Sequence, residues 1–176
     1  IMTLVKVLCI RGSDTSGGAG IQADLKAVSA CGAWGMSVIT AVTAQNTKGV
    51  QDVFAVSPEF VGRQIDVIMN DIGADAVKTG MLLNADIVAM VADKIKQYGM
   101  EKLIVDPVMV AKGGRYLLQT KARQTLVKKL LPQALLVTPN IPEAEVIAGM
   151  DIKSIAAMKK AAKVIQDCGA KNVLIK

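Results

Sequence analysis

Residues 13–26 read SDTSGGAGIQADLK and follow a short apolar run at residues 4–10. Three glycines within four positions, Gly17, Gly18 and Gly20, permit backbone conformations and a close approach to a ligand that side chains would block. The residues after Gly20 have the apolar spacing of an amphipathic helix. A strand, a glycine-rich turn and a helix N-terminus in this order predict an α/β fold with a ligand-binding turn.

Two nucleotide-binding patterns come close to this stretch. Gly12 and Gly17 have the spacing of a P-loop, but Gly18 and Ala19 stand where Lys and Ser or Thr should follow. The segment GAGIQA at residues 18–23 fits a loose dinucleotide fingerprint, yet the acidic residue expected about 20 residues later is absent. A tight strand-to-helix turn without a ligand is a third interpretation that these residues leave open.

The composition indicates a folded protein. Of 176 residues, 52% are hydrophobic and 20% charged, which suits one α/β domain over residues 1–176. No apolar stretch approaches the ~20 residues of a membrane span, and the start lacks a signal-peptide pattern, so we expect a cytoplasmic protein with no membrane partner. The net charge is +6, but the basic residues are dispersed and aromatics are only 3%, which argues against a nucleic-acid partner.

The sequence contains no histidine, which excludes a Ser-His-Asp triad, a Cys-His pair and histidine metal sites within these residues. Cys9, Cys31 and Cys168 are widely separated and lack CxxC spacing, so we expect buried, reduced thiols. Chemistry must therefore rest on carboxylates, lysines, backbone amides and bound ions.

Apolar, β-branched runs alternate with amphipathic patterns along the chain. This alternation predicts a largely parallel sheet flanked by helices on both faces. Ser57 before Pro58, and Asn84 before Asp86, fit helix N-caps. We expect strands at residues 4–10, 37–43, 74–77, 103–105, 135–138 and 173–175, and helices at residues 20–30, 58–70, 85–98, 120–131, 142–148 and 154–167.

Polar or glycine-rich segments follow the first five expected strands. They are the glycine-rich stretch, TAQNT at 43–47, KTGM at 78–81, DPVM at 106–109 and TPN at 138–140. Ligands in open α/β sheets bind beyond the carboxyl ends of the strands, so these segments should meet at one edge. Their convergence predicts a small-molecule site.

Together these motifs resemble the hydroxymethylpyrimidine/phosphomethylpyrimidine kinases of thiamin synthesis. The resemblance rests on GSD-x-SGGAGIQADLK from residue 12, the segments at 43–47 and 78–81, DPVMVAK at 106–112 and TPNIPEA at 138–144. It implies a ribokinase-like α/β fold and phosphoryl transfer from ATP to 4-amino-5-hydroxymethyl-2-methylpyrimidine and then to its monophosphate. It also implies use of Mg²⁺ and assembly as a homodimer.

The resemblance further assigns roles to residues. Gln45 would hydrogen-bond the ring and amino edge of the pyrimidine, because an amide offers a donor and an acceptor together. Asp106, which also fits a turn before Pro107, would lie with Lys176 near the nucleotide phosphates. Asn140 and Glu143 would serve Mg²⁺, directly or through water, although this pair also fits a helix capping box. The same pyrimidine pocket would be lined by Gly12, Ala19, Asp24, Thr43, Met81 and Val108.

The chain differs from the family at two places and lacks one of the family's loops. Arg11 stands where the family usually has Ala, and Gly113-Gly114-Arg115 where it often has Ser-Gly-Asp. The sequence leaves open whether Arg11 crowds the site or projects into solvent. The family's Gly-Thr-Gly-Cys-Thr loop, which supplies the catalytic cysteine, has no counterpart in residues 1–176. We therefore expect a fold whose C-terminal part is missing, no catalytic residue within the chain, and severely impaired transfer.

Two other functions stay open beside the pyrimidine kinase. A pyridoxal-type kinase of the same fold shares the glycine-rich stretch, although the segment AQNT at 44–47 favours the pyrimidine. A non-catalytic module would bind the pyrimidine without transferring phosphate.

Overall fold

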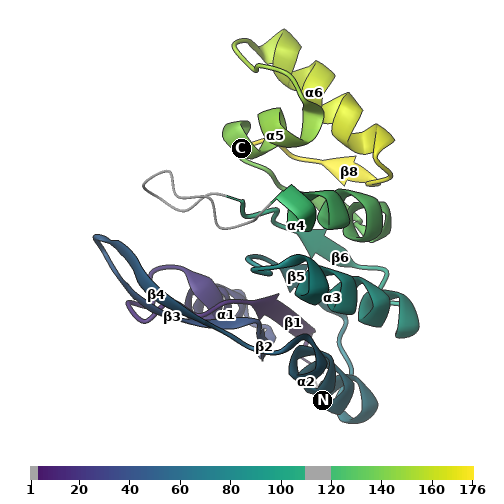
Figure 1. The fold of residues 1–176 in the computed structure, drawn as a ribbon. Helices are drawn as coiled ribbons and strands as arrows, with labels where there is room; N and C mark the ends of the chain where they lie inside the picture. Colours follow the sequence, from purple (N-terminus) through teal and green to yellow (C-terminus); the bar gives the residue numbers. More distant parts are fainter. Residues whose placement is uncertain (1–3, 110–119) are drawn as a thin grey trace.

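The structure is a computed structural model that describes residues 4–109 and 120–176. Its main feature in these residues is a sheet of six strands in the order β2-β1-β5-β6-β7-β8, with every neighbouring pair parallel (Figure 1). The predicted largely parallel α/β fold is confirmed. The strands are β1 (Lys6–Arg11), β2 (Trp34–Ile39), β5 (Ala76–Thr79), β6 (Leu103–Val105), β7 (Leu136–Val137) and β8 (Asn172–Val173).

Helices cover both faces of the sheet, as predicted. The first helix, α1 (Gly20–Ala30), packs on β1 and β2, where a methyl group at Gly35 would lie 2.9 Å from Leu25. The later helices lie side by side on the opposite face (Figure 1). They are α2 (Pro58–Asp71), α3 (Ala85–Gln97), α4 (Thr120–Thr125), the π-helical turn η1 (Leu126–Leu130), the 3₁₀ turn η2 (Leu131–Gln133), α5 (Ile141–Ala148) and α6 (Ile155–Asp167).

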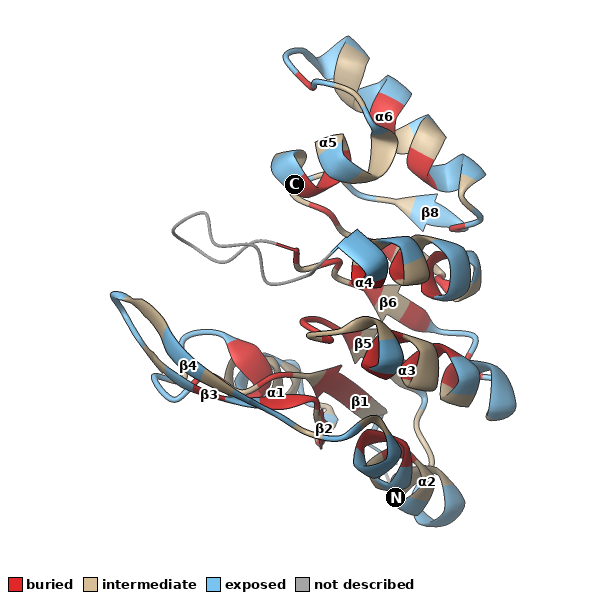
Figure 2. Cartoon of the chain, viewed as in Figure 1, coloured by how far each residue is buried: buried red, intermediate tan, exposed pale blue. Residues whose placement is uncertain are grey.

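The core lies between the sheet and these later helices. Leu8 and Ile10 of β1 are fully buried in one cluster with Ile65 of α2 and Val91 of α3 (Figure 2). Burying an aliphatic side chain of this size stabilises the fold by about 1.5–3 kcal/mol. None of the described helices is long and apolar enough to cross a membrane. The single-domain organisation stays a prediction.

The three cysteines differ in exposure. Cys9 is buried beneath α1, and burial together with the charge of Asp24 raises the pKa of its thiol to about 11. Cys168 is half-buried, but Cys31 is exposed. The expectation of buried thiols is therefore wrong for Cys31, because this residue caps the C-terminal end of α1, where the chain turns into solvent.

Polar side chains set the predicted helix starts. The Ser57 hydroxyl accepts a hydrogen bond from the backbone N–H of Phe60 at 3.2 Å, and Asn84 Oδ1 accepts one from the N–H of Ile87 at 2.9 Å. Each bond satisfies an amide of the first turn that has no partner within the helix. Both N-caps predicted from the sequence are confirmed.

The predicted strand at residues 37–43 is wrong in its second half. The chain leaves the main sheet at Thr40, whose buried hydroxyl donates to the carbonyl of Met81 at 2.8 Å. It then forms β3 (Ala41–Asn46), which pairs antiparallel with β4 (Gly49–Ala55) as a separate two-stranded sheet. Apart from Ala41, residues 38–43 are all β-branched, so the composition does not mark the bend.

Candidate active site

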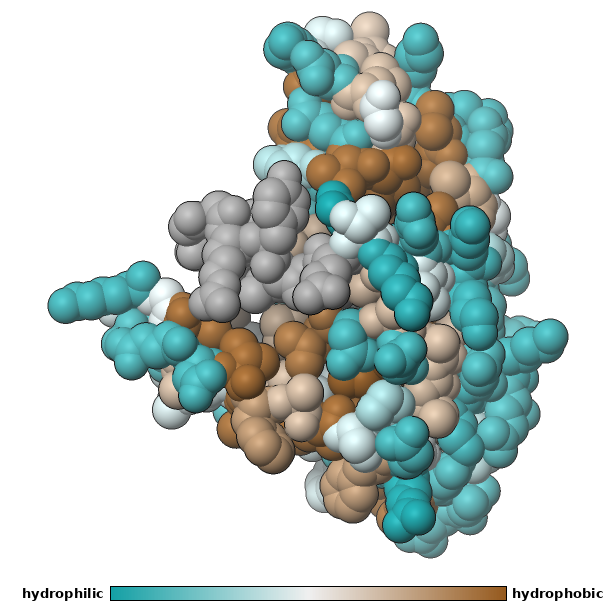
Figure 3. All heavy atoms as spheres, in the orientation of Figure 1, coloured by the Kyte–Doolittle hydropathy of each residue, from teal (hydrophilic) through white to brown (hydrophobic). Residues whose placement is uncertain are grey.

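A cavity of about 490 Å³ lies at the carboxyl ends of β1 and β5. These strands are neighbours, and the chain leaves them in opposite directions, from β1 to β2 and from β5 to β6. Open α/β sheets bind ligands at such a switch point. The hairpin β3–β4 forms the outer wall, and hydrophobic side chains gather where it meets the body of the molecule (Figures 1 and 3). Six of the seven residues predicted for the pyrimidine pocket line this cavity: Gly12, Ala19, Thr43, Gln45, Met81 and Val108.

Asp14 organises the glycine-rich stretch from within. Its buried carboxylate accepts hydrogen bonds from the backbone N–H of Ser16 at 2.9 Å, from the Ser16 hydroxyl at 2.8 Å and from the N–H of Ala19 at 2.7 Å. Burial alone would raise the pKa of Asp14, but these hydrogen bonds outweigh burial and hold its pKa below the ordinary value of 3.8. The carboxylate of Asp14 therefore accepts from backbone N–H groups of the kind that bind a phosphate in a P-loop. This agrees with the absence of a P-loop lysine, since Gly18 stands at that position.

Gly20 is required where the stretch enters α1. Its φ is +63°, and a β-carbon at this position would lie 2.5 Å from the backbone N of Asp14 and 2.7 Å from the carbonyl carbon of Ser13. Backbone atoms cannot rotate away from such a contact as a flexible side chain can. The turn therefore folds tightly against itself and gives the cavity a fixed inner wall.

The hairpin is bonded to this inner wall. The backbone N–H of Thr43 donates to Ser13 Oγ at 2.9 Å, and the Thr43 hydroxyl donates to the Ser13 carbonyl at 2.9 Å. Gln45 is half-buried beside them, with Oε1 only 3.5 Å from that same hydroxyl. Because the Thr43 proton is already used at the shorter distance, the Gln45 amide keeps its acceptor and its NH₂ donors for a ligand.

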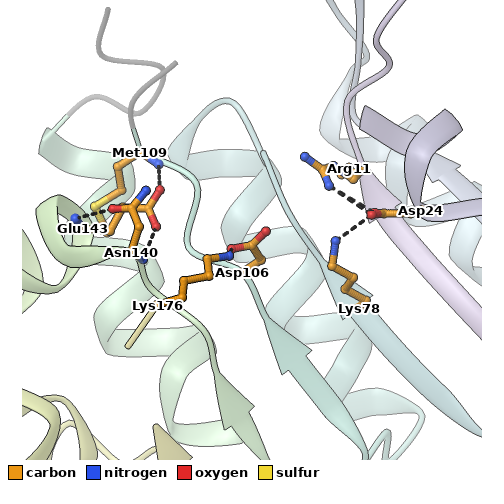
Figure 4. Close-up of polar contacts among 8 residues, drawn as sticks. All are labelled: Arg11, Asp24, Lys78, Asp106, Met109, Asn140, Glu143 and Lys176. Atoms are coloured by element: carbon orange, nitrogen blue, oxygen red, sulfur yellow. Dashed lines mark hydrogen bonds and ion pairs between the residues drawn. The ribbon is translucent and has the colours of Figure 1, made fainter. Parts of the chain in front are cut away.

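Asp24 is the one predicted pocket residue that does not line the cavity. Its carboxylate is 10% exposed and accepts from Arg11 Nη1 at 3.1 and 3.2 Å and from Lys78 Nζ at 2.7 Å (Figure 4). Arg11 itself lines the cavity and is 13% exposed, so it neither projects into solvent nor fills the site. The ion pairs hold Asp24 behind Arg11, one side chain away from the cavity.

Asp106 and Lys176 come together as a pair at the same edge of the sheet. Lys176 Nζ lies 2.9 Å from Asp106 Oδ1, although 70 positions separate them in the chain (Figure 4). Asp106 follows β6 and Lys176 follows β8, so the parallel sheet aligns the two segments. The half-exposed side chain of Lys176 and the carboxylate of Asp106 are therefore accessible to polar groups of a ligand.

Asn140 and Glu143 form the helix capping box that their spacing also allowed. Asn140 Oδ1 accepts from the N–H of Glu143 at 2.9 Å, and Glu143 Oε2 accepts from the N–H of Asn140 at 3.0 Å. The second carboxylate oxygen accepts from the N–H of Met109 at 3.4 Å. Burial raises the pKa of Glu143, and the neighbouring Asp106 adds to this, against the opposing effect of the hydrogen bonds. The cap and the bond from Met109 account for the hydrogen bonds of both side chains, and their role toward a metal stays a prediction.

Other residues that line the cavity were not among the site residues predicted from the sequence. Asp14 and Ser16 come from the glycine-rich stretch, and Lys48, Gly49 and Val53 come from the hairpin turn and β4. The signal was present in NTKG at residues 46–49, a polar turn ending in glycine between two β-branched runs. Residues 110–112 of the motif DPVMVAK, and the departure at 113–115, lie outside the described residues.

A family model and a curated relative both indicate the same family. The family model described as phosphomethylpyrimidine kinase matches residues 14–176. The chain is 51% identical over 175 residues to the hydroxymethylpyrimidine/phosphomethylpyrimidine kinase of Bacillus subtilis, covering 99% of this chain and 65% of that protein. It therefore spans just under two thirds of the length of this curated relative.

Solved structures extend the similarity to the fold. A phosphomethylpyrimidine kinase from Clostridium difficile superposes with a TM-score of 0.93 at 48% identity, over 98% of this chain and 74% of that one. The pyridoxal kinase of Bacillus subtilis, solved as an ADP complex, gives a TM-score of 0.91 at 40% identity, over 98% and 66%. A pyridoxal kinase from Staphylococcus aureus in complex with AMP-PCP and pyridoxal gives 0.88 at 38% identity, over 99% and 63%.

Proposed function

The chain belongs to the phosphomethylpyrimidine kinase family, and on this premise we propose that it serves the ATP-dependent phosphorylation of 4-amino-5-hydroxymethyl-2-methylpyrimidine and of its monophosphate. The observation that carries the proposal is the cavity at the switch point between β1 and β5, with the amide of Gln45 in its wall. In this proposal the glycine-rich stretch and the hairpin enclose the phosphate acceptor rather than the nucleotide.

The chemistry of the wall suits a small aminopyrimidine. Gln45 offers an acceptor to the exocyclic amino group and a donor to a ring nitrogen. Met81 and Val108 supply apolar contact to the ring faces, and Met81 is only 7% exposed. A pocket with a few placed polar groups and apolar walls is typical of small-molecule sites. These groups would fix the ring so that its hydroxymethyl group faces the phosphoryl donor.

The nucleotide would lie on the side of Asp106 and Lys176. Lys176 is suited to a phosphate oxygen, and Asp106 has one carboxylate oxygen that Lys176 does not use. The described residues hold no group of three acidic, cysteine or histidine side chains for a metal. Mg²⁺ next to ATP is usually bound by only one or two carboxylates together with phosphates and water, so Asp106, with Glu143 acting through water, fits this requirement.

The residues of the cavity contribute positioning and charge. In the first transfer, the hydroxymethyl oxygen loses its proton to solvent and forms a bond to the γ-phosphorus of ATP while the bond from that phosphorus to ADP breaks. In the second transfer, an oxygen of the monophosphate takes the place of the hydroxymethyl oxygen. Such a reaction depends mainly on alignment of the two oxygens and on stabilisation of the charge on the phosphoryl group. Gln45 would align the acceptor, the hairpin would exclude water, and Lys176 would balance phosphate charge.

Calorimetry followed by a product assay tests the proposal. The pyrimidine alcohol is titrated into the chain, and ATP with Mg²⁺ is then added while the phosphorylated product is measured by chromatography. Binding with product formation supports the kinase, and binding without product supports a non-catalytic pyrimidine module. Absence of both binding and product would refute the assignment of the cavity.

A pyridoxal-type kinase is the second candidate. The similarity to solved pyridoxal kinases, with TM-scores of 0.88 and 0.91, favours it. The higher identity to the pyrimidine kinases and the Gln45 segment favour the pyrimidine. Competition between pyridoxal and the pyrimidine alcohol in the same calorimetric experiment distinguishes them, since tighter binding of pyridoxal would reverse the preference.

We also propose a homodimer that works in the cytoplasm. Val42 and Phe54 face each other across the hairpin and are 51% and 74% exposed, which gives a second copy an apolar contact. The free cysteines suit a reducing compartment. Sedimentation at micromolar concentration tests the assembly, and a strictly monomeric mass would refute it.

A further inference from the structure

We propose that Arg11 selects the phosphorylated acceptor by binding the phosphate group of a phosphate monoester in the cavity. The inference rests on the proposed function and deepens it, because it names a residue that separates the two acceptors of one site. The resemblance to the family assigns no role to Arg11.

The guanidinium is built into the wall. Arg11 ends β1, and its side chain crosses Gly80, the residue after β5. A methyl group at Gly80 would lie 2.8 Å from Arg11 Nε, 3.0 Å from Cζ and 3.1 Å from Cδ, and these are its three nearest neighbours. The glycine therefore provides the space that this arginine occupies. Asp24 fixes the far end by accepting from Nη1 with both carboxylate oxygens.

Part of the guanidinium has no partner in the protein. Nε is buried and makes no hydrogen bond with any residue in the described part of the chain. Nη2 likewise has none there, and Figure 4 shows the second terminal nitrogen pointing away from Asp24. Because Nε is buried against Gly80, Nη2 is the donor that the guanidinium offers to a ligand, and a guanidinium N–H is well suited to a phosphate oxygen.

The local charge favours an anion. Arg11 and Lys78 share the single carboxylate of Asp24, so two positive charges and one negative leave a net charge of +1. The carboxylate of Asp14, which also lines the cavity, adds one negative charge, and Lys48 of the same wall adds one positive charge. The sum over these five side chains therefore stays at +1. The neutral alcohol gains little from this field, whereas a phosphate monoester gains directly.

Two sources of phosphate are available to the site, the acceptor monoester and the nucleotide. Arg11 lines the same cavity as Gln45, while Lys176 and Asp106 do not line it. The acceptor is therefore the source to which Arg11 is assigned. Measuring the affinity for ATP as well as for the monophosphate distinguishes a contact with the nucleotide from a contact with the acceptor.

Calorimetry on the 176-residue chain tests the inference without requiring turnover. The probes are 4-amino-5-hydroxymethyl-2-methylpyrimidine, its monophosphate and ATP. We expect Arg11→Ala to lower the affinity for the monophosphate about 10-fold or more, consistent with the loss of a charge-assisted pair. The affinities for the alcohol and for ATP should change less than about 2-fold. Asp24 keeps Lys78 as a partner in this variant, so the substitution leaves no isolated buried charge.

Two further variants sharpen the test. Gly80→Ala should displace the guanidinium and weaken the monophosphate in the parent chain, yet have no effect on binding in the Arg11→Ala background. Lys153→Ala removes the same unit charge from a side chain that is 84% exposed, and it should leave all three affinities unchanged. Thermal melts of each variant verify that it is folded.

Each outcome decides the inference. Equal weakening of alcohol and monophosphate would overturn it in favour of a purely structural arginine, and selective weakening of ATP would overturn it in favour of a nucleotide contact. If the parent chain bound neither pyrimidine, the proposed function would fail together with the inference. Selective weakening of the monophosphate alone supports both.

Discussion

Replacing Asp14 by Asn tests whether an internal carboxylate holds the glycine-rich stretch in place. The carboxylate accepts from the N–H and hydroxyl of Ser16 and from the N–H of Ala19. An amide has only one acceptor oxygen, so in either orientation its NH₂ faces a donor. Losing one charge-assisted hydrogen bond costs about 1.5–3 kcal/mol, and weakening the other brings the expected loss of unfolding free energy to about 2–4 kcal/mol. This is a large part of the ~5–15 kcal/mol typical of a domain.

Urea denaturation of both proteins from pH 7 to pH 3 measures this loss. The pKa of Asp14 lies below its ordinary value of 3.8 in the folded chain, so its stabilisation is complete above that value and is lost as the pH falls through the folded-state pKa. The difference between the proteins should therefore be full at pH 7 and shrink below about pH 4. Asp167→Asn, at a side chain 64% exposed, is the matched control and should change stability by less than ~0.5 kcal/mol. A similarly small effect for Asp14, or one that grows in acid, would refute the reasoning.

Three other predictions concern separate parts of the molecule. Gln45→Ala should weaken binding of the pyrimidine alcohol by about 1–3 kcal/mol in calorimetry, since its amide partners are lost, and an unchanged affinity would remove Gln45 from the site. Tyr98→Phe should lower the free energy of unfolding in urea by about 1 kcal/mol, because the hydroxyl that donates to Asp66 at 2.7 Å joins α3 to α2; equal stability would show that this bond contributes nothing. Iodoacetamide at pH 8 should label exposed Cys31 readily and leave buried Cys9, with its pKa near 11, unmodified in mass spectrometry; early labelling of Cys9 would contradict the burial.

The sequence predicts the framework of the fold well. Five of the six expected strands and the helix starts at Ser57 and Asn84 agree with the structure to within a few residues. Buried parallel strands read as short apolar runs, and caps need particular side chains, so both leave a local signal. The hairpin β3–β4 escapes this reasoning because the chain changes sheets at Thr40 through a contact with Met81, 41 positions away.

The residues of the candidate site likewise fall into a group that the sequence predicts and a group that it does not. Gly12, Ala19, Gln45 and Met81 line the cavity, and Gly12 and Met81 closely follow β1 and β5. Asp24 of α1 does not line the cavity, because its position depends on two cations, Arg11 of β1 and Lys78 of β5. The sequence gives no measure of the geometry of these ion pairs. Arg11 shows this most clearly. Its orientation follows from the missing side chain of Gly80, 69 positions later.

The place of β1 in the sheet has a consequence for synthesis of the protein. β1 precedes the other described strands in the chain but lies inside the sheet, and it pairs with β2 on one side and with residues 76–79 of β5 on the other. At roughly 5–20 residues per second, a ribosome needs roughly 3–13 s after residue 10 to reach residue 76, and until then the backbone N–H and C=O groups along one edge of β1 have no strand partner. A nascent chain stalled in this interval exposes Leu8 and Ile10, which are fully buried in the finished molecule. Chaperone binding to nascent chains should therefore peak between the completion of β2 and the emergence of β5.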